Sequence, residues 1–139
     1  MIHGKFYRTL PKEAMFIREE VFMKEQGFEN EFDDTDHIAV HYVLFDDNAP
    51  IGCCRYFPDK EPDCYLIGRI AILSAYREKH LGAYLLAEAE KQVKKDGGIK
   101  LSLSAQLRVK AFYIKQGYTP MGDIYMDEHC EHIHMEKML

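Results

Sequence analysis

The stretch that decides the fold is residues 65–86, YLIGRIAILSAYREKHLGAYLL. Its first nine residues carry apolar side chains at both alternating sets of positions, which is typical of a central strand covered on both faces. The segment SAYREKH that follows is polar and basic, and from Leu81 onward apolar residues recur at helical spacing. The stretch therefore predicts a buried strand, a basic turn and a helix, in that order.

The basic turn has the arrangement of an anion site. A strand that ends just before a helix directs the free N–H groups and the positive dipole end of that helix toward the turn. Arg77 and Lys79 add positive charge there. A basic turn of this kind is also often merely solvated, so the residues alone leave both interpretations open.

Further strands and helices flank this stretch on both sides. Period-two and helical patterns predict strands at 4–8, 37–45, 51–57, 100–105, 118–126 and 132–139, and helices at 11–26, 81–96 and 106–116. This order predicts a single α/β domain over residues 1–139, with a mixed central sheet of six to seven strands flanked by about four helices.

Composition narrows the class of protein. A chain of 139 residues that is 47% hydrophobic is long enough to bury a core. The chain has 18 Lys and Arg residues against 23 Asp and Glu residues, and this net charge of -5 disfavours general affinity for nucleic acid or anionic membranes. No apolar run approaches the ~20 residues that span a bilayer, and the N-terminus lacks a signal pattern, so we expect a cytoplasmic protein.

The cysteines and histidines raise the question of a metal site. The four cysteines follow no CxxC spacing, and adjacent Cys53 and Cys54 on a strand would point to opposite faces, so we expect reduced structural thiols. Cys130, His132 and His134 share one strand alternation, but a single zinc would require strong strand curvature or a ligand from another segment. The prediction is therefore that no metal is bound.

Three separated motifs resemble a known family. Residues 77–82 read REKHLG after RIAILSAY, residues 112–118 read FYIKQGY after the pair AQ at 105–106, and IREEVFMKEQ occupies 17–26. Together they resemble the GNAT acyl-CoA N-acyltransferases, in particular the ElaA-like branch, in which a Q/R-x-x-G-x-G/A turn binds the pyrophosphate of coenzyme A. The resemblance implies an acetyl-CoA-dependent N-acetyltransferase that acts by direct attack of a primary amine. A non-catalytic acyl-CoA-binding or sensing module is the alternative.

His80 stands where the family turn usually has a glycine. Glycine permits a positive φ and a close approach of phosphate. Histidine is enriched in the left-handed region and tolerates it better than a β-branched residue does, so we expect the turn to keep its shape. The imidazole is also able to donate a hydrogen bond to phosphate.

The resemblance implies a set of residues that bind acetyl-CoA. The backbone of Ile70 and Ile72 would pair with the amides of the pantetheine arm as an added strand does. The complete implied set is Ile70, Ala71, Ile72, Arg77, Lys79, His80, Leu81, Gly82, Ala83, Gln106 and Phe112.

The resemblance also implies catalytic roles. Tyr113 would protonate the departing thiolate, unless it is an ordinary helix aromatic. Many relatives have a glutamate base where this chain has Gly68, so no carboxylate base is carried over. His132 is the leading candidate base, while a polar strand face formed by His132 and His134, or proton loss through water, stays open.

The acceptor site is the least determined part. The residues expected to bind substrate are Arg18, Glu25, Gln26 and Arg69, near an acidic run at 33–36 that would attract a cationic amine or simply be a solvated loop. Arg69, inside an apolar strand, is more often a paired structural charge than a substrate clamp. We expect a small-molecule or peptide amine as the acceptor and a symmetric homodimer as the default assembly.

Overall fold

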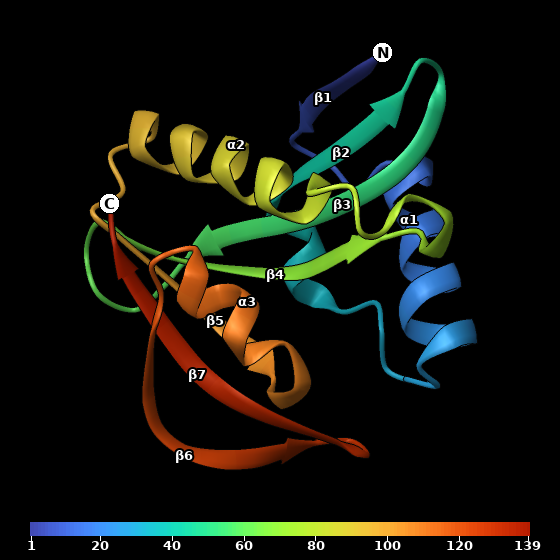
Figure 1. The fold of residues 1–139 in the computed structure, drawn as a ribbon. Coiled ribbons are helices and arrows are strands. Elements are labelled where there is room, and N and C mark those ends of the chain that lie inside the picture. The colour runs from blue at the N-terminus through green and yellow to red at the C-terminus, as the bar shows by residue number, and fades with distance from the viewer.

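A computed structural model describes all of residues 1–139, and it places a seven-stranded sheet between helices on both of its faces (Figure 1). The strands are β1 (Ile2–Tyr7), β2 (Val40–Asp46), β3 (Ala49–Pro58), β4 (Cys64–Ile72), β5 (Lys100–Gln106), β6 (Thr119–Asp127) and β7 (Cys130–Met138). The α-helices are α1 (Lys12–Arg18), α2 (Leu81–Lys95) and α3 (Lys110–Lys115), and a π-helix (Glu19–Glu25) continues α1.

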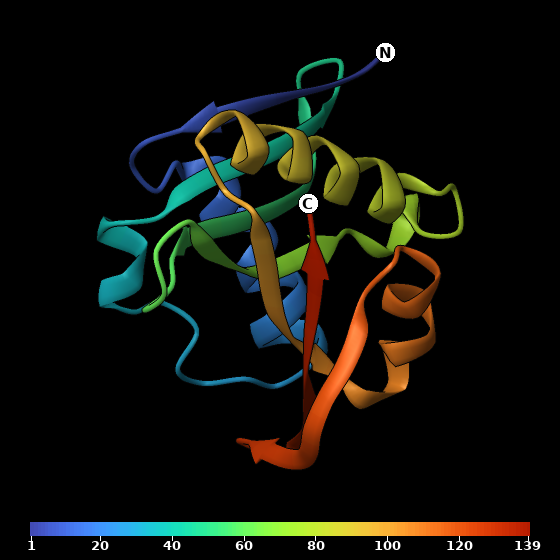
Figure 2. The ribbon, with the colours of Figure 1, turned by 90° about the vertical axis from the view of Figure 1, so that its left-hand side faces the viewer.

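The sheet has the order β1-β2-β3-β4-β5-β7-β6, and the pairing of β4 with β5 is its one parallel pairing. These two strands pair only from Cys64 to Leu66 on β4 and from Lys100 to Ser102 on β5. Beyond these residues β4 and β5 diverge, as Figure 2 shows for the green and gold strands. The centre of the sheet therefore opens into a gap between two strand ends.

A β-bulge lies in β4 where the strand begins to diverge from β5. Cys53 of β3 pairs with Ala71, and Arg55 pairs with Gly68, so β4 has one more residue than β3 over this interval. Arg69 takes a φ of 52° at the bulge. A bulge bends its strand and increases the local twist, and here it turns β4 away from β5.

Two hydrophobic cores lie on opposite faces of the sheet. Helices α2 and α3 cover one face, where Leu85, Ala89 and Val93 are fully buried, and α1 with the π-helix covers the other. Cys54 belongs to the first core and Cys53 to the second, which confirms the predicted alternation of the two thiols. All four cysteines are free.

The predicted fold class and order of elements are confirmed, with local differences. The predicted helix at 11–26 is an α-helix that widens into a π-helix, and it ends before Gly27, which has a φ of 76°. The predicted helix at 106–116 begins with a 3₁₀ turn (Leu107–Val109) before α3. The acidic segment contains a 3₁₀ helix (Asp34–His37). No helix is long and apolar enough to cross a membrane.

Candidate functional site

A cavity of about 1070 Å³ occupies the gap between β4 and β5. On one face of the sheet it is lined by the start of α2 and by α3, and on the other by the π-helix, residues 28–33 and the hairpin between β6 and β7. The divergence of two central strands therefore produces a passage that reaches both faces of the sheet. A thioester and an amine could approach each other within it from opposite sides.

The turn before α2 supplies one end of this cavity. His80 takes φ 59° and ψ 19°, and Glu78 takes a φ of 63°, so two non-glycine residues adopt the left-handed conformation. No side chain caps α2, and its first internal backbone hydrogen bond is donated by Tyr84 to the His80 carbonyl at 3.2 Å. The N–H groups of residues 81–83 are thus left free at the cavity wall, where an anion would accept hydrogen bonds from them.

Helix α3 and several basic side chains surround this turn. At Gly82 the nearest neighbour of an added Cβ would be the Phe112 ring at 3.5 Å, so the helix start packs closely against α3. Arg77, His80, Arg108 and Lys115 line the cavity. Lys79 does not line it, and its ammonium lies 5.3 Å from the centre of the Tyr76 ring. The positive charge at this end therefore comes from the turn between β4 and α2, from the 3₁₀ turn at 107–109 and from α3.

The π-helix is connected to the far sides of the gap by two side-chain bridges. Glu25 receives two hydrogen bonds from the Arg77 guanidinium, at 2.5 and 2.7 Å. These bonds from Arg77 hold the pKa of the Glu25 carboxyl below its usual range. Gln106, at the end of β5, donates to Gln26 at 2.7 Å. Arg77 also donates to the Ile72 carbonyl at 2.9 Å, so this carbonyl of the β4 edge is already occupied.

Tyr113 lies on α3 at the wall of the cavity and is only 8% exposed. Its ring packs edge-on against Phe112 and Tyr118. Burial first, and the neighbouring Cys54 thiol second, raise the pKa of the Tyr113 phenol above its usual value. The phenol therefore keeps its proton at neutral pH and is available as a donor rather than as a base.

His132 and His134 have different surroundings, although both belong to β7. His132 is 6% exposed, lines the cavity, and lies between the rings of Phe28 and Tyr125. Its Nδ1 is 3.0 Å from the Cys130 carbonyl oxygen. A carbonyl only accepts, so this bond puts the proton on Nδ1 and leaves the lone pair of Nε2 free.

His134 is not part of the cavity wall, and its Nε2 is 3.0 Å from a carboxylate oxygen of Glu136. Only one of the two histidines thus reaches the candidate site. Nowhere in the structure do three or more His, Cys, Asp or Glu side chains gather in a way that could hold a metal ion.

Three arginines and three acidic residues form a largely buried ionic cluster on the α1 face. Its members are Arg18, Glu31, Asp33, Asp36, Arg55 and Arg69. Arg18 is 1% exposed and binds Asp36 through two nitrogens, at 2.7 and 3.1 Å, and Glu31 at 2.9 Å. Arg55 contacts the same Asp36 oxygen at 2.7 Å. The cluster is balanced in charge and attaches the acidic segment to α1, β3 and β4.

The cluster corrects one expectation about the acceptor site. Arg18 was expected to bind substrate, but its guanidinium is enclosed by carboxylates and it does not line the cavity. Arg69 does line the cavity, and it is mainly a structural partner of Glu31, at 2.8 Å. The bulge explains why this charge is tolerated in an apolar strand, because it turns the side chain toward the acidic segment.

Two features of the site had no signal in the sequence that we could interpret. Arg55 binds Asp33 at 2.6 Å and lines the cavity, although its position in β3 looked unremarkable. Glu128, in the hairpin between β6 and β7, accepts backbone N–H bonds from Glu29 at 3.1 Å and Asn30 at 3.2 Å. This contact joins the hairpin to a segment that lies 98–99 residues earlier in the chain and also lines the cavity.

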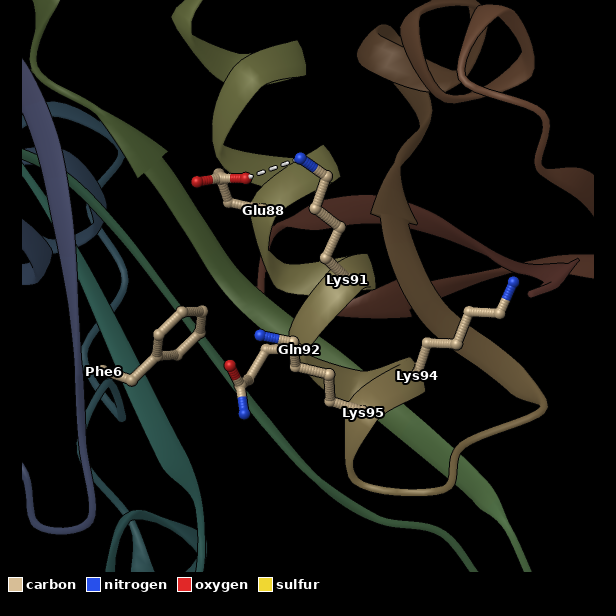
Figure 3. Close-up of a pocket in the computed structure, with 6 residues that line it drawn as sticks. All are labelled: Phe6, Glu88, Lys91, Gln92, Lys94 and Lys95. Carbon is tan, nitrogen blue, oxygen red and sulfur yellow. Dashed lines mark ion pairs between the residues drawn. The ribbon is translucent and has the colours of Figure 1, made fainter.

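A second hollow lies beside α2, away from the gap (Figure 3). It is lined by Phe6, Glu88, Lys91, Gln92, Lys94 and Lys95. Lys91 is 3.4 Å from Glu88, and the three lysines are exposed. No buried polar group faces this hollow, so we assign it no chemistry.

Known proteins resemble this chain over nearly its full length. The model of the acetyltransferase (GNAT) domain matches residues 9–139. The uncharacterized N-acetyltransferase YjcF of Bacillus subtilis is 32% identical over 130 residues, which are 91% of each chain. An acyl-CoA N-acyltransferase of Pseudomonas aeruginosa superposes with a TM-score of 0.87 at 22% identity, covering 99% of both chains. Escherichia coli ElaA does so with a TM-score of 0.86 at 21% identity, again covering 99% of both.

Proposed function

The chain belongs to the GNAT acetyltransferase family and is an acyltransferase, and we propose that it transfers an acetyl group from acetyl-CoA directly to a primary amine. The observation that carries this proposal is the cavity between β4 and β5. It has an uncapped helix N-terminus and basic side chains at one end and His132 at the other. An anionic thioester substrate and an amine would enter such a passage from opposite faces.

The cofactor side is suited to a pyrophosphate and an extended amide chain. The free N–H groups of residues 81–83, with Arg77 and His80, are the donors that we assign to the pyrophosphate. From Ile67 onward β4 has no strand partner on its β5 side, and pantetheine amides would pair with that edge. Bound in this way, acetyl-CoA supplies the acyl thioester.

We assign His132 the role of general base, which accepts the proton of the attacking amine. Its Nδ1–H is oriented by the Cys130 carbonyl, which leaves Nε2 as the acceptor. The aromatic rings of Phe28 and Tyr125 restrict its rotation. A base that is held in one tautomer and one orientation needs little reorganisation to accept a proton.

We assign Tyr113 the role of general acid, which donates a proton to the departing sulfur. The phenol lies on the wall of the cavity, and burial raises its pKa further above neutral pH. Donation of its hydrogen bond to sulfur would stabilise the negative charge as the carbon–sulfur bond breaks.

We assign a cationic amine as the acceptor on grounds of charge. Asp127 and Glu128 line the cavity on the same side as His132. The carboxylates of the ionic cluster are neutralised by arginines, so the hairpin residues contribute most of the unbalanced negative charge at this opening. A protonated amine would be attracted here and would lose its proton before attack.

The test is the release of thiol from acetyl-CoA over a panel of primary amines. We expect Tyr113→Phe and His132→Gln each to lower kcat by about 10²-fold or more, since general acid–base groups contribute about that much. His134→Gln is the matched control because it changes the same residue type on the same strand outside the cavity. Its activity should stay close to that of the unmodified protein.

The competing function is a non-catalytic acyl-CoA-binding module. It would bind acetyl-CoA, raise the melting temperature on binding, and release no thiol with any amine. If the Tyr113→Phe, His132→Gln and His134→Gln variants were equally active, the protein would still be a transferase. Neither Tyr113 nor His132 would then take part in catalysis.

A further inference from the structure

We infer that Glu25 acts as an internal competitor for the pyrophosphate of coenzyme A: it binds Arg77 in the free enzyme and releases it when coenzyme A binds. The inference rests on the proposed function, because it takes Arg77 as a phosphate-binding residue. It adds a role for Glu25 that differs from the substrate-binding role expected from the sequence. Glu25 thereby sets the affinity of the cofactor.

The geometry of the pair supports such an exchange. Both terminal nitrogens of Arg77 donate to the two carboxylate oxygens of Glu25, at 2.5 and 2.7 Å. The third donor position, Nε, binds the Ile72 carbonyl at 2.9 Å. An arginine fork binds carboxylate and phosphate with the same two-pronged geometry. The nitrogens that would face a phosphate are therefore already occupied by a carboxylate.

The exposure of the pair makes the exchange feasible. The Arg77 side chain is 38% exposed and that of Glu25 is 42% exposed. Ion pairs that open to solvent contribute little to stability and are easily replaced. A pyrophosphate carries more charge than one carboxylate and also accepts hydrogen bonds from the helix N-terminus, so it is the stronger ligand for Arg77.

The position of Glu25 connects this exchange to the acceptor side. Glu25 ends the π-helix, whose residues Val21 and Phe22 line the cavity. The π-helix is joined to the far sides of the gap by the Glu25–Arg77 pair and by the bond between Gln26 and Gln106. Loss of the first bridge on cofactor binding would leave only the second, so the wall of the acceptor site would become freer to adjust to an amine.

The direct test is calorimetric measurement of coenzyme A binding to four proteins: the unmodified enzyme, Glu25→Gln, Arg77→Gln and the double variant. We expect Glu25→Gln to tighten binding by about 3- to 5-fold, the range expected for an exposed ion pair. Arg77→Gln should weaken binding by about 10-fold. In the Arg77→Gln background, Glu25→Gln should change the dissociation constant by less than about 2-fold, because the guanidinium for which Glu25 and the pyrophosphate compete is absent.

Two controls isolate the mechanism. Pantetheine lacks the pyrophosphate, so its binding should be the same for Glu25→Gln and the unmodified enzyme. Glu20→Gln removes a charge from the same helix, where Glu20 pairs only with Lys24, and should leave coenzyme A binding unchanged. Equal tightening with and without Arg77 would overturn the inference, because it would indicate general charge repulsion, and so would no tightening at all.

Different results would refute the proposed function and this inference. An unmodified enzyme that binds no coenzyme A at millimolar concentration would refute the cofactor assignment itself, and the competition with it. Binding by the unmodified enzyme without an effect of Glu25→Gln would refute only the competition.

Discussion

Arg18 and Arg77 both bind carboxylates through two or more short hydrogen bonds, yet they lie in opposite environments. Arg18 is 1% exposed and belongs to a cluster in which every charge has a partner of opposite sign. Arg77 is 38% exposed at the opening of the cavity and has a single acidic partner. The two arginines use the same hydrogen-bonding chemistry, one in the interior and one at the surface.

Burial decides what each pair can do. A buried charge that loses its partner cannot recover the missing interaction from water, so the pairs of Arg18 are obligatory and structural. An exposed pair exchanges its partner for water or for another anion at little cost, so the pair of Arg77 is replaceable. The role of an arginine near an active site therefore depends on its exposure as well as on its partners.

The largest effect on stability should come from removing the buried arginine, Arg18. We expect Arg18→Met to lower the free energy of unfolding by about 3–5 kcal/mol, because Glu31 and Asp36 each lose a partner in a buried site. Arg77→Met is the matched control and should change it by less than about 1 kcal/mol. Urea denaturation of both variants measures the difference. Similar losses in the two variants would show that burial does not separate these arginines.

A smaller effect concerns pH. Burial by itself raises the pKa of Asp36, but the hydrogen bonds from Arg18 and Arg55 outweigh it and lower the pKa to about 2. A lowered pKa in the folded state means stability that is present above the ordinary pKa and is lost as pH falls toward the folded one. We expect a loss on the order of 2 kcal/mol between about pH 4 and pH 2.

This pH dependence is checked by urea titrations at a series of pH values. Asp36→Asn should be less stable at neutral pH and should show a flatter decline below about pH 4. Glu25→Gln, which changes an exposed pair, should flatten the decline much less than Asp36→Asn does. An unchanged decline in Asp36→Asn would assign the acid sensitivity to other carboxylates.

The smallest effect concerns the backbone of the exposed turn. His80 has a φ of 59°, which a β-branched residue adopts only with strain. We expect His80→Gly to change the unfolding free energy by less than about 1 kcal/mol and His80→Val to lower it by about 1–2 kcal/mol. Thermal melting of both variants is the measurement. Equal stability of the two would indicate that the turn relaxes out of the left-handed conformation.

Much of the framework could be predicted from the pattern of residues. The nearly continuous apolar run at 65–73 and the helical spacing after Leu81 predicted β4 and α2 to within a residue or two, because both patterns are local. The left-handed His80 was also predictable, since the tolerance of a residue type for positive φ is a property of its own side chain. The π-helix was not, because it differs from an α-helix only in its hydrogen bonds.

The arrangement of the site followed less from the sequence. The strand pattern alone did not separate His132 from His134, and only the family resemblance favoured His132 as a base. In the structure His132 lines the cavity next to Phe28, and His134 does not. Arg18 looked like a substrate residue, and its burial depends on Asp36, which comes 18 residues later in the chain. These outcomes depend on segments that meet only after the chain folds.

The sequence by itself determined the order of elements, the free thiols on opposite faces of β3 and the basic turn before α2. Each of these depends on neighbouring residues and on the periods of helix and strand. Only the tertiary structure decided which charges are buried, which histidine reaches the cavity, and that Glu25 meets Arg77. The physical reason is that the role of a charged side chain depends on its partners and on its access to water, and both are set by distant parts of the chain.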